Sequence, residues 1–209
     1  MTQGTPEWHA ARLGKVTASR LVDVLAKVKN GEAAARANYR AELVAERLTG
    51  KHADGFVNAA MKWGTEAEPL ARAAYEAEFG LLVQEVGLID HPSIPMTGAS
   101  PDGLVSIDGL IEIKCPETKA HINTLLRKAA PEQYIPQMQW QMACTGRQWC
   151  DFASYDPRLP ESMRIFIQRV ERDEEYIAWL ETEVTKFLAE LDEKVAALRA
   201  IYEPQREAA

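Results

Sequence analysis

The sequence predicts a mixed α/β protein in which short strands occupy the middle of the chain and helices flank them. Residues 110–115 alternate apolar and charged side chains, a pattern typical of a half-buried strand. Two further runs, at 148–154 and 163–170, are rich in Phe, Trp, Ile and Val, which favour strands. The last segment instead places apolar residues three or four positions apart from Ile177 to Ile201, as an amphipathic helix does.

The first eighty residues are predicted to be helical. We expect helices at 6–13, with Trp8 buried, at 33–48 and at 58–79. Gly50 and Gly80 follow the last two, as C-terminal glycines commonly do.

The middle of the chain should form the sheet. We expect one strand at 81–89 and a hairpin of strands near 96–105 and 110–115, joined by Asp108-Gly109. Helices near 117–128 and 131–145 follow, then the two strands named above. A helix from Asp173 to about Tyr202 ends the chain. These segments predict a single domain over 1–209, with a helical part at 1–80, a sheet core at 81–170 and a C-terminal helix at 171–209.

The expected hairpin carries three ionisable side chains, because Asp102 precedes its first strand and Glu112 and Lys114 lie in its second. Period-two alternation places Glu112 and Lys114 on one face and Ile111 and Ile113 on the other. Carboxylate and carbonyl oxygens are the ligands of hard cations such as Mg²⁺. The pattern therefore predicts a metal site of Asp102, Glu112 and the carbonyl of Ile113. Lys114 would orient a water and stabilise developing negative charge.

An alternative interpretation of the same residues is a surface hairpin. Glu112 and Lys114 would then form an exposed ion pair worth roughly 0–1 kcal/mol. The spacing alone does not separate the two interpretations.

Composition limits the classes of protein to which the chain can belong. At 209 residues with 46% hydrophobic content it can form a real core. No apolar run approaches the ~18 residues of a membrane span, and no secretory signal pattern precedes residue 8. The cysteines Cys115, Cys144 and Cys150 form no paired framework, so we expect reduced thiols and a cytoplasmic location.

The net charge of −7 is unevenly distributed. Residues 1–60 carry nine Lys and Arg against six Asp and Glu, whereas residues 171–209 carry five against eleven. Phosphate binding requires a local positive potential and not a basic protein. An acidic exterior around a basic groove therefore remains compatible with a nucleic-acid substrate.

Motifs along nearly the whole chain point to one family. Residues 100–103 read S-P-D-G and residues 112–116 read E-I-K-C-P. This pair resembles the PD-(D/E)xK nuclease signature, and more narrowly that of phage lambda exonuclease and the YqaJ-like viral recombinases. Other segments resemble motifs of that family in the same order; they are W-x(3)-R-x-G-x-V-T-A-S at 8–19, W-G-T-E-A-E at 63–68, Q-M-Q-W-Q-M at 137–142, Y-D-P-R at 155–158 and V-E-R-D at 170–173. The resemblance implies a central mixed sheet with helices packed on it.

The resemblance also implies roles for five residues outside the hairpin. It places a metal-site carboxylate at Glu68 and the family's active-site glutamine at Gln137. Arg12 would grip a terminal phosphate with its planar guanidinium, and Ser19 and Ser100 would help to hold it. Without the resemblance, Glu68 would be interpreted as a solvated helical glutamate and Arg12 as a surface arginine. Ser19 would be interpreted as a helix cap and Ser100 as a turn residue.

Some neighbouring residues are not assigned to the site. Residues i and i+2 of a helix face about 200° apart, so Gln137, Gln139 and Gln141 cannot all reach one point. Gln139 and Gln141 are therefore interpreted as ordinary polar helix positions, and Glu66 as a solvated glutamate.

By resemblance, the expected function is Mg²⁺-dependent digestion of one strand of linear double-stranded DNA. The family works from a 5′-phosphorylated end, releases mononucleotides and leaves a 3′ single-stranded tail for phage-type recombination. The resemblance further implies one or two Mg²⁺ ions, replaceable by Mn²⁺, a homotrimeric ring and a single-strand annealing partner. The alternatives are a PD-(D/E)xK endonuclease and a catalytically inactive protein that binds DNA ends.

Overall fold

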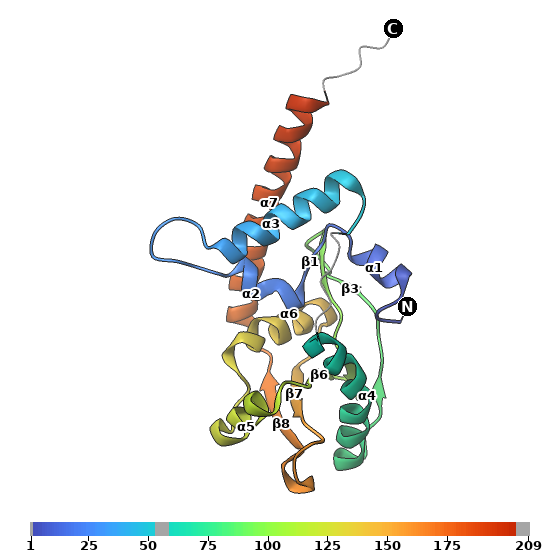
Figure 1. The fold of residues 1–209 in the computed structure, drawn as a ribbon. Coiled ribbons are helices and arrows are strands. Elements are labelled where there is room, and N and C mark those ends of the chain that lie inside the picture. Colours follow the sequence, from blue (N-terminus) through green and yellow to red (C-terminus); the bar gives the residue numbers. More distant parts are fainter. Residues whose placement is uncertain (1, 53–58, 204–209) are drawn as a thin grey trace.

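The protein is built around a five-stranded sheet, of which Figure 1 labels β6, β7 and β8. The computed structural model describes residues 2–52 and 59–203. The strand order is β2-β5-β6-β7-β8. β6 and β7 are parallel and the other neighbours are antiparallel, so the predicted mixed sheet is confirmed. The strands are β2 (Val83–Gln84), β5 (Gly103–Val105), β6 (Gly109–Lys114), β7 (Trp149–Tyr155) and β8 (Ile165–Glu171).

Helices cover both faces of this sheet, because β6 and β7 carry buried apolar residues on both faces. Tyr75 of α4 packs with Ile111 and Ile113 on one face. Met138 of α6 packs in the larger core cluster with Phe152 on the other face. The helices are α1 (Pro6–Arg12), α2 (Leu21–Val24), α3 (Ala34–Thr49), α4 (Ala59–Phe79), α5 (Thr118–Arg127), α6 (Ile135–Thr145) and α7 (Glu174–Tyr202), with short 3₁₀ turns η1 (Ala18–Arg20), η2 (Glu132–Tyr134) and η3 (Glu161–Met163).

A second, three-stranded sheet has the order β1-β4-β3. Its strands are β1 (Val16–Thr17), β3 (Ile89–Asp90) and β4 (Thr97–Ala99). The predictions of single strands at 81–89 and 96–105 are wrong, because each segment crosses from one sheet to the other. Between β4 and β5, Pro101 has no N–H to donate to a ladder. The side chain of Asp102 there bonds the amide of Ile113.

The hairpin between β5 and β6 is confirmed, but its turn differs from the predicted one. Val105 pairs with Gly109 across three residues, so Gly109 belongs to the strand and Asp108-Gly109 is not the two-residue turn. Ser106 takes the left-handed conformation, with φ 51°. A Cβ on Gly109 would lie 2.0 Å from the ring of Trp149, so close packing explains the glycine.

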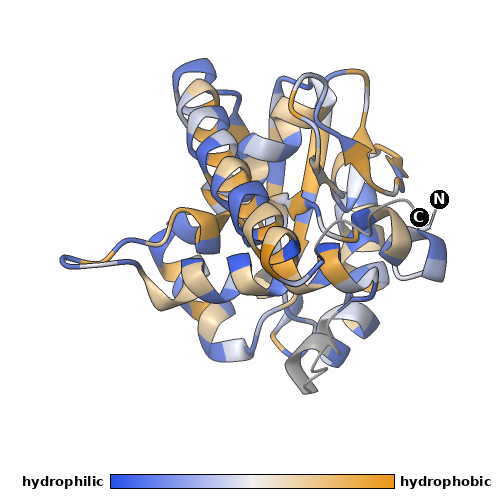
Figure 2. Ribbon diagram, turned by 90° about the horizontal axis from the view of Figure 1, so that it is seen from above, coloured by the Kyte–Doolittle hydropathy of each residue, from blue (hydrophilic) through white to orange (hydrophobic). Residues whose placement is uncertain are grey.

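The outer helices largely follow the predicted pattern. α3 ends at Gly50, which has φ 67°. α7 begins after Asp173, whose carboxylate accepts a bond from the Tyr176 amide. Figures 1 and 2 both show the loop between α2 and α3 projecting from the body, and its tip is hydrophilic. Among the described helices, none is both long and apolar enough to cross a membrane.

Two predictions near the N-terminus need correction. Trp8 is half-buried and not buried, because α1 lies at the edge of the structure with no fully buried residue. Ser19, for which a helix cap was the alternative, is not one, because Thr17 and Arg20 occupy the N-cap positions of η1 and α2, and neither caps through its side chain. Thr17 instead accepts a hydrogen bond from Arg12, and Ser19 is exposed.

Candidate active site

Glu112 is at the centre of the candidate site, at the carboxyl end of β6. It is only 1% exposed, and its Oε1 lies 2.5 Å from Nζ of Lys114. The interpretation of these residues as an exposed surface ion pair is therefore wrong. A buried carboxylate is costly unless it is paired and hydrogen-bonded, so its neighbours matter.

Two glutamines of α6 supply the remaining hydrogen bonds to Glu112. Nε2 of Gln137 donates to Oε1 at 2.6 Å and Nε2 of Gln141 donates to Oε2 at 2.5 Å. The interpretation of Gln141 as an ordinary polar position is wrong. Its i, i+4 spacing from Gln137 places both on one helix face, and this was the signal in the sequence. Gln139 faces elsewhere, where it bonds the carbonyl of Glu171 and the amide of Asp173.

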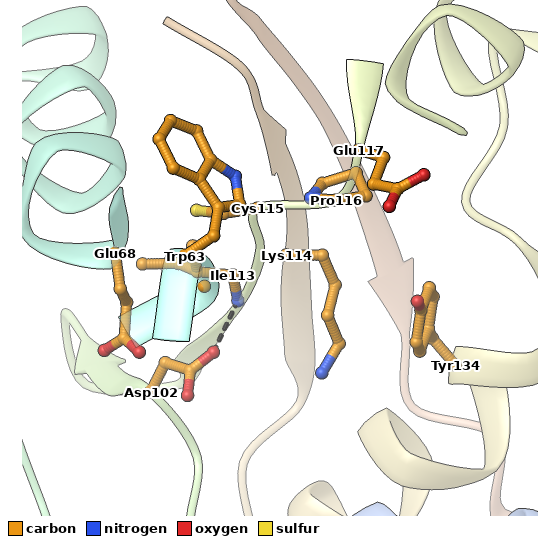
Figure 3. A pocket seen from close by; sticks show the side chains of 10 residues that line it. Trp63, Glu68, Asp102, Ile113, Lys114, Cys115, Pro116, Glu117 and Tyr134 are labelled. Carbon is orange, nitrogen blue, oxygen red and sulfur yellow. Dashed lines mark hydrogen bonds between the residues drawn. The ribbon is translucent and has the colours of Figure 1, made fainter. Parts of the chain in front are cut away.

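Asp102 lies beside the ion pair of Glu112 and Lys114, as predicted. Its Oδ2 accepts a hydrogen bond of 2.6 Å from the Ile113 amide, drawn in Figure 3. Burial raises the pKa of Asp102 well above its ordinary value, and the charge of Glu112 raises it further. Burial also lowers the pKa of Lys114, but Glu112 and Asp102 outweigh it and raise that pKa above its ordinary value. Lys114 is thus a protonated donor and not a base in this state.

Glu68 of α4 lines the same cavity as Asp102. Figure 3 shows its side chain beside that of Asp102. Burial raises the pKa of Glu68, while Arg72, at 2.8 Å, opposes that shift. Glu66, two residues earlier, is exposed, as predicted.

The cavity has a volume of ≈ 480 Å³ and lies between α4, the end of β6 and the turn η2. Lys114 extends into it between Trp63 and Tyr134 in Figure 3. Nζ of Lys114 is 5.0 Å from the Tyr134 ring centroid. The residues that line the cavity are Trp63, Gly64, Glu68, Asp102, Ile113, Lys114, Cys115, Pro116, Glu117 and Tyr134.

The residues around the cavity are suited to a hard cation. Within residues 2–52 and 59–203, no group of three or more His, Cys, Asp and Glu side chains forms a metal site by itself. Mg²⁺ does not need one, since it is usually bound by one or two carboxylates with waters and substrate oxygens. Asp102, Glu112 and the Ile113 carbonyl could supply the protein ligands, with Glu68 close by. Burial, and then the charge of Glu112, raise the pKa of Asp102, and a bound cation would favour its ionised form.

A second polar cluster surrounds Arg12. Its Nη1 donates to Ser100 at 3.3 Å and its Nη2 to Thr17 at 3.4 Å. The guanidinium lies 4.1 Å from the Trp8 ring centroid, and Trp8 Nε1 also donates to Ser100, at 3.0 Å. The structure thus brings Arg12 and Ser100 together as predicted. Ser19 is exposed on η1, and no contact joins it to Arg12.

This arginine is suited to an anion. Within the described part of the chain, Arg12 forms an ion pair with no carboxylate, and the side chains that accept its hydrogen bonds are hydroxyls. Burial lowers its pKa, which means that its charge is poorly solvated. A phosphate would stabilise such a guanidinium, because it can accept two parallel hydrogen bonds from it.

The fold is one that solved exonucleases have. It superposes on an alkaline exonuclease, LHK-Exo of Laribacter hongkongensis, with a TM-score of 0.88 and 59% identity over 94% of this chain and 97% of that one. LHK-Exo in complex with dAMP superposes with a TM-score of 0.89. A phage-related exonuclease of Haemophilus somnus 129PT shares the fold, with a TM-score of 0.71 and 17% identity over 88% of this chain and 96% of that one.

The family follows from the sequence. Residues 7–148 match the YqaJ-like viral recombinase domain. This match spans more than half of the chain, so the protein belongs to the YqaJ-like viral recombinase family. The chain is also 30% identical over 78 residues to the uncharacterized protein ExoD of Escherichia coli (strain K12), covering 37% of this chain and 88% of that protein.

Proposed function

We propose that this protein is a Mg²⁺-dependent exonuclease that degrades one strand of linear double-stranded DNA from a 5′-phosphorylated end. The family and the solved relatives support a DNA exonuclease. The products would be mononucleotides and a 3′ single-stranded tail suited to homologous recombination.

The observation that carries this proposal is the short connection between the two polar clusters. Ser100 contacts Arg12, and Asp102 lines the acidic cavity. Two residues span at most about 7 Å of extended chain. That distance is comparable to one nucleotide, so a terminal phosphate on Arg12 would place the next phosphodiester at the carboxylates.

The metal would bind to Asp102, Glu112 and the carbonyl of Ile113, with Glu68 assisting. A bound Mg²⁺ offsets charge on the phosphate and acidifies an attacking water. Mn²⁺, which also accepts carboxylate and carbonyl ligands, should substitute.

The protein's own residues would position the reactants. Lys114 remains protonated and donates hydrogen bonds to the water or to the phosphate, which stabilises the charge that develops there. Gln137 contacts both Glu112 and Lys114, so it fixes their relative position and can reach the scissile phosphate. Gln141 holds the other oxygen of Glu112.

Direction would come from Arg12 and Ser100, with Ser19 close in sequence to the same cluster. The relative LHK-Exo forms a complex with dAMP, which is consistent with a 5′-mononucleotide product here. Assembly into a homotrimeric ring and transfer of the tail to a single-strand annealing protein are carried by the family resemblance. Light scattering tests the ring, for which we expect three times the 23.3 kDa chain mass.

One assay tests the function. Linear duplex with a 5′-phosphate, linear duplex with a 5′-hydroxyl and closed circular DNA are each incubated with Mg²⁺. We expect rapid loss of the first, slow loss of the second and no cutting of the third. Cutting of the circle would indicate an endonuclease, and no digestion of any substrate would indicate a protein that only binds ends.

Arg12→Ala should remove the preference for the 5′-phosphate, because its guanidinium is the cation of the second cluster. We expect KM for the phosphorylated duplex to rise about tenfold or more, as loss of a charge-assisted contact predicts, with kcat changed less. An unchanged preference would exclude Arg12 from the site.

A further inference from the structure

The end of α3 holds the loop that follows Arg12. The amide of Gly14 donates to Oε2 of Glu46 at 2.7 Å, and Nε of Arg47 donates to the Gly14 carbonyl at 2.9 Å. Gly14 has φ 68°, and a Cβ there would lie 2.8 Å from Cγ of Arg47. The position of Arg12 therefore depends on how firmly α1 is docked on α3.

His52 completes this docking through both of its ring nitrogens. Nδ1 lies 2.7 Å from Oε1 of Glu46, and Nε2 lies 2.6 Å from the carbonyl oxygen of His9. A carbonyl can only accept a hydrogen bond, and an ionised carboxylate also only accepts. With Glu46 ionised, both nitrogens carry a proton, so the geometry favours an imidazolium. Glu46 is 5% exposed, and a buried carboxylate needs such a partner.

The contact to His9 also satisfies a backbone carbonyl at the C-terminal end of α1. The amide of Leu13 bonds Ala10 and not His9, so the carbonyl of His9 is one that the helix leaves without its i+4 partner. A cation at a helix C-terminus is favourable. His52 thus joins two elements, the last turn of α1 and the end of α3.

The groups around His52 favour its imidazolium form. Burial lowers the pKa of His52, but the His9 carbonyl and the Glu46 carboxylate together outweigh it and leave that pKa raised. Arg12 opposes the rise. Among the described residues, the ring of His9 is a further titratable neighbour, with its centroid 5.9 Å from that of His52.

We propose that His52, as an imidazolium between Glu46 and the His9 carbonyl, is a positioning residue that sets Arg12 for the terminal phosphate of DNA. This rests on the proposed function of Arg12. When His52 loses a proton, one of its two hydrogen bonds is replaced by repulsion between two acceptors. The end of α1 then loosens and phosphate recognition weakens, while the carboxylate cavity is unaffected.

The first measurement needs no DNA. NMR titration of the His52 ring should give a pKa above the ordinary value near 6.5, and Glu46→Gln should lower it. The indole N–H of Trp8, which bonds Ser100 beside Arg12, should shift with the same pKa. His52→Gln should abolish that shift, whereas His9→Gln, which keeps the carbonyl, should retain it. A His52 pKa at or below the ordinary value, or a Trp8 signal indifferent to His52, would overturn the proposal.

The second measurement uses kinetics between pH 6.5 and 9. KM for the 5′-phosphorylated duplex should rise about tenfold as His52 deprotonates, the loss expected for one charge-assisted hydrogen bond. The 5′-hydroxyl duplex should show no such rise, and kcat should follow the same pH profile in wild type and His52→Gln. His52→Gln should have a high KM at every pH; if it kept the wild-type inflection, His52 would not be the positioning group. If the protein digests neither duplex, the proposed function fails, and the NMR result still decides whether His52 controls the Arg12 cluster.

Discussion

At the scale of single residues, the site depends on how a buried carboxylate is satisfied. Glu112 receives hydrogen bonds from Gln137 and Gln141 and pairs with Lys114. Each bond fixes one of its oxygens, so a metal ligand at this position is oriented before any metal arrives. Neighbours that orient a ligand in this way commonly affect metal affinity or activity strongly.

Gln141→Ala should therefore impair catalysis although Gln141 does not line the cavity. We expect kcat to fall about 10–100-fold, and the Mg²⁺ concentration for half-maximal activity to rise, the range usual for residues behind a metal ligand. A Mg²⁺ titration of the initial rate measures both.

Gln139→Ala is the matched control on the same helix. Gln139 bonds backbone groups at Glu171 and Asp173, so its loss should cost about 1–3 kcal/mol of stability and leave the Mg²⁺ titration unchanged. If Gln139→Ala affected the titration and Gln141→Ala did not, the role assigned to Gln141 would be wrong.

At the scale of elements, the site is positioned by strand connections and not by a single hairpin. The segment between β4 and β5 passes from the small sheet to the central sheet, and it carries Ser100 and Asp102. Ser100 therefore meets α1, while Asp102 meets β6. The pairing of β6 with β7 in turn fixes the position of β6, which Asp102 contacts.

Gly109 is the position where that packing is most sensitive. Its missing Cβ leaves room for the Trp149 ring, 2.0 Å from where the atom would lie. Gly109→Ala should cost about 1–3 kcal/mol, as overpacking usually does, and chemical denaturation measures it. Adding Trp149→Leu should recover part of the loss. Simple additivity of the two changes would contradict the packing explanation.

At the scale of the whole molecule, charge is separated between segments. The chain carries −7 in total, yet residues 1–60 are net basic, and Arg12 lies there. Negative charge is concentrated in the acidic cavity and along α7. DNA binding should accordingly weaken as salt rises.

The acidic cavity should cost stability in the absence of a cation. Because the pKa of Asp102 is raised in the folded protein, its ionised form at neutral pH is less favourable than in the unfolded chain. Asp102→Asn should therefore raise the free energy of unfolding in EDTA at pH 7. That difference should shrink as pH falls from the raised value towards the ordinary one near 3.9. At a Mg²⁺ concentration of 100 times Kd, wild type should gain about 2.7 kcal/mol and the variant much less.

Asp156 offers a control of opposite sign. Burial raises its pKa, but hydrogen bonds from Arg158 and Thr118 outweigh this and lower that pKa to about 2. Its ionised form therefore stabilises the fold above the ordinary pKa, and that contribution is lost as pH falls towards 2. Asp156→Asn should lower stability at pH 7 with or without Mg²⁺. A gain in stability there, or a loss for Asp102→Asn in EDTA, would contradict this account.

The sequence by itself determined most of the helices and the strand β6, and it predicted the chemistry of the hairpin. Alternation in β6 placed Glu112 away from Ile111 and Ile113, and the spacing of apolar residues gave α7, because both patterns are periodic and local. The family's motifs pointed to Arg12, Glu68 and Gln137, whose roles stay predictions.

Only the tertiary structure decided which of these residues meet. It showed that Glu112 is buried, that Gln141 holds it, and that Ser100 lies against Arg12. It also divided the predicted strands at 81–89 and 96–105 between two sheets. Burial and contact depend on which elements pack together across the chain, and a local pattern contains no such information. His52 shows the same limit, since its two partners lie on different helices.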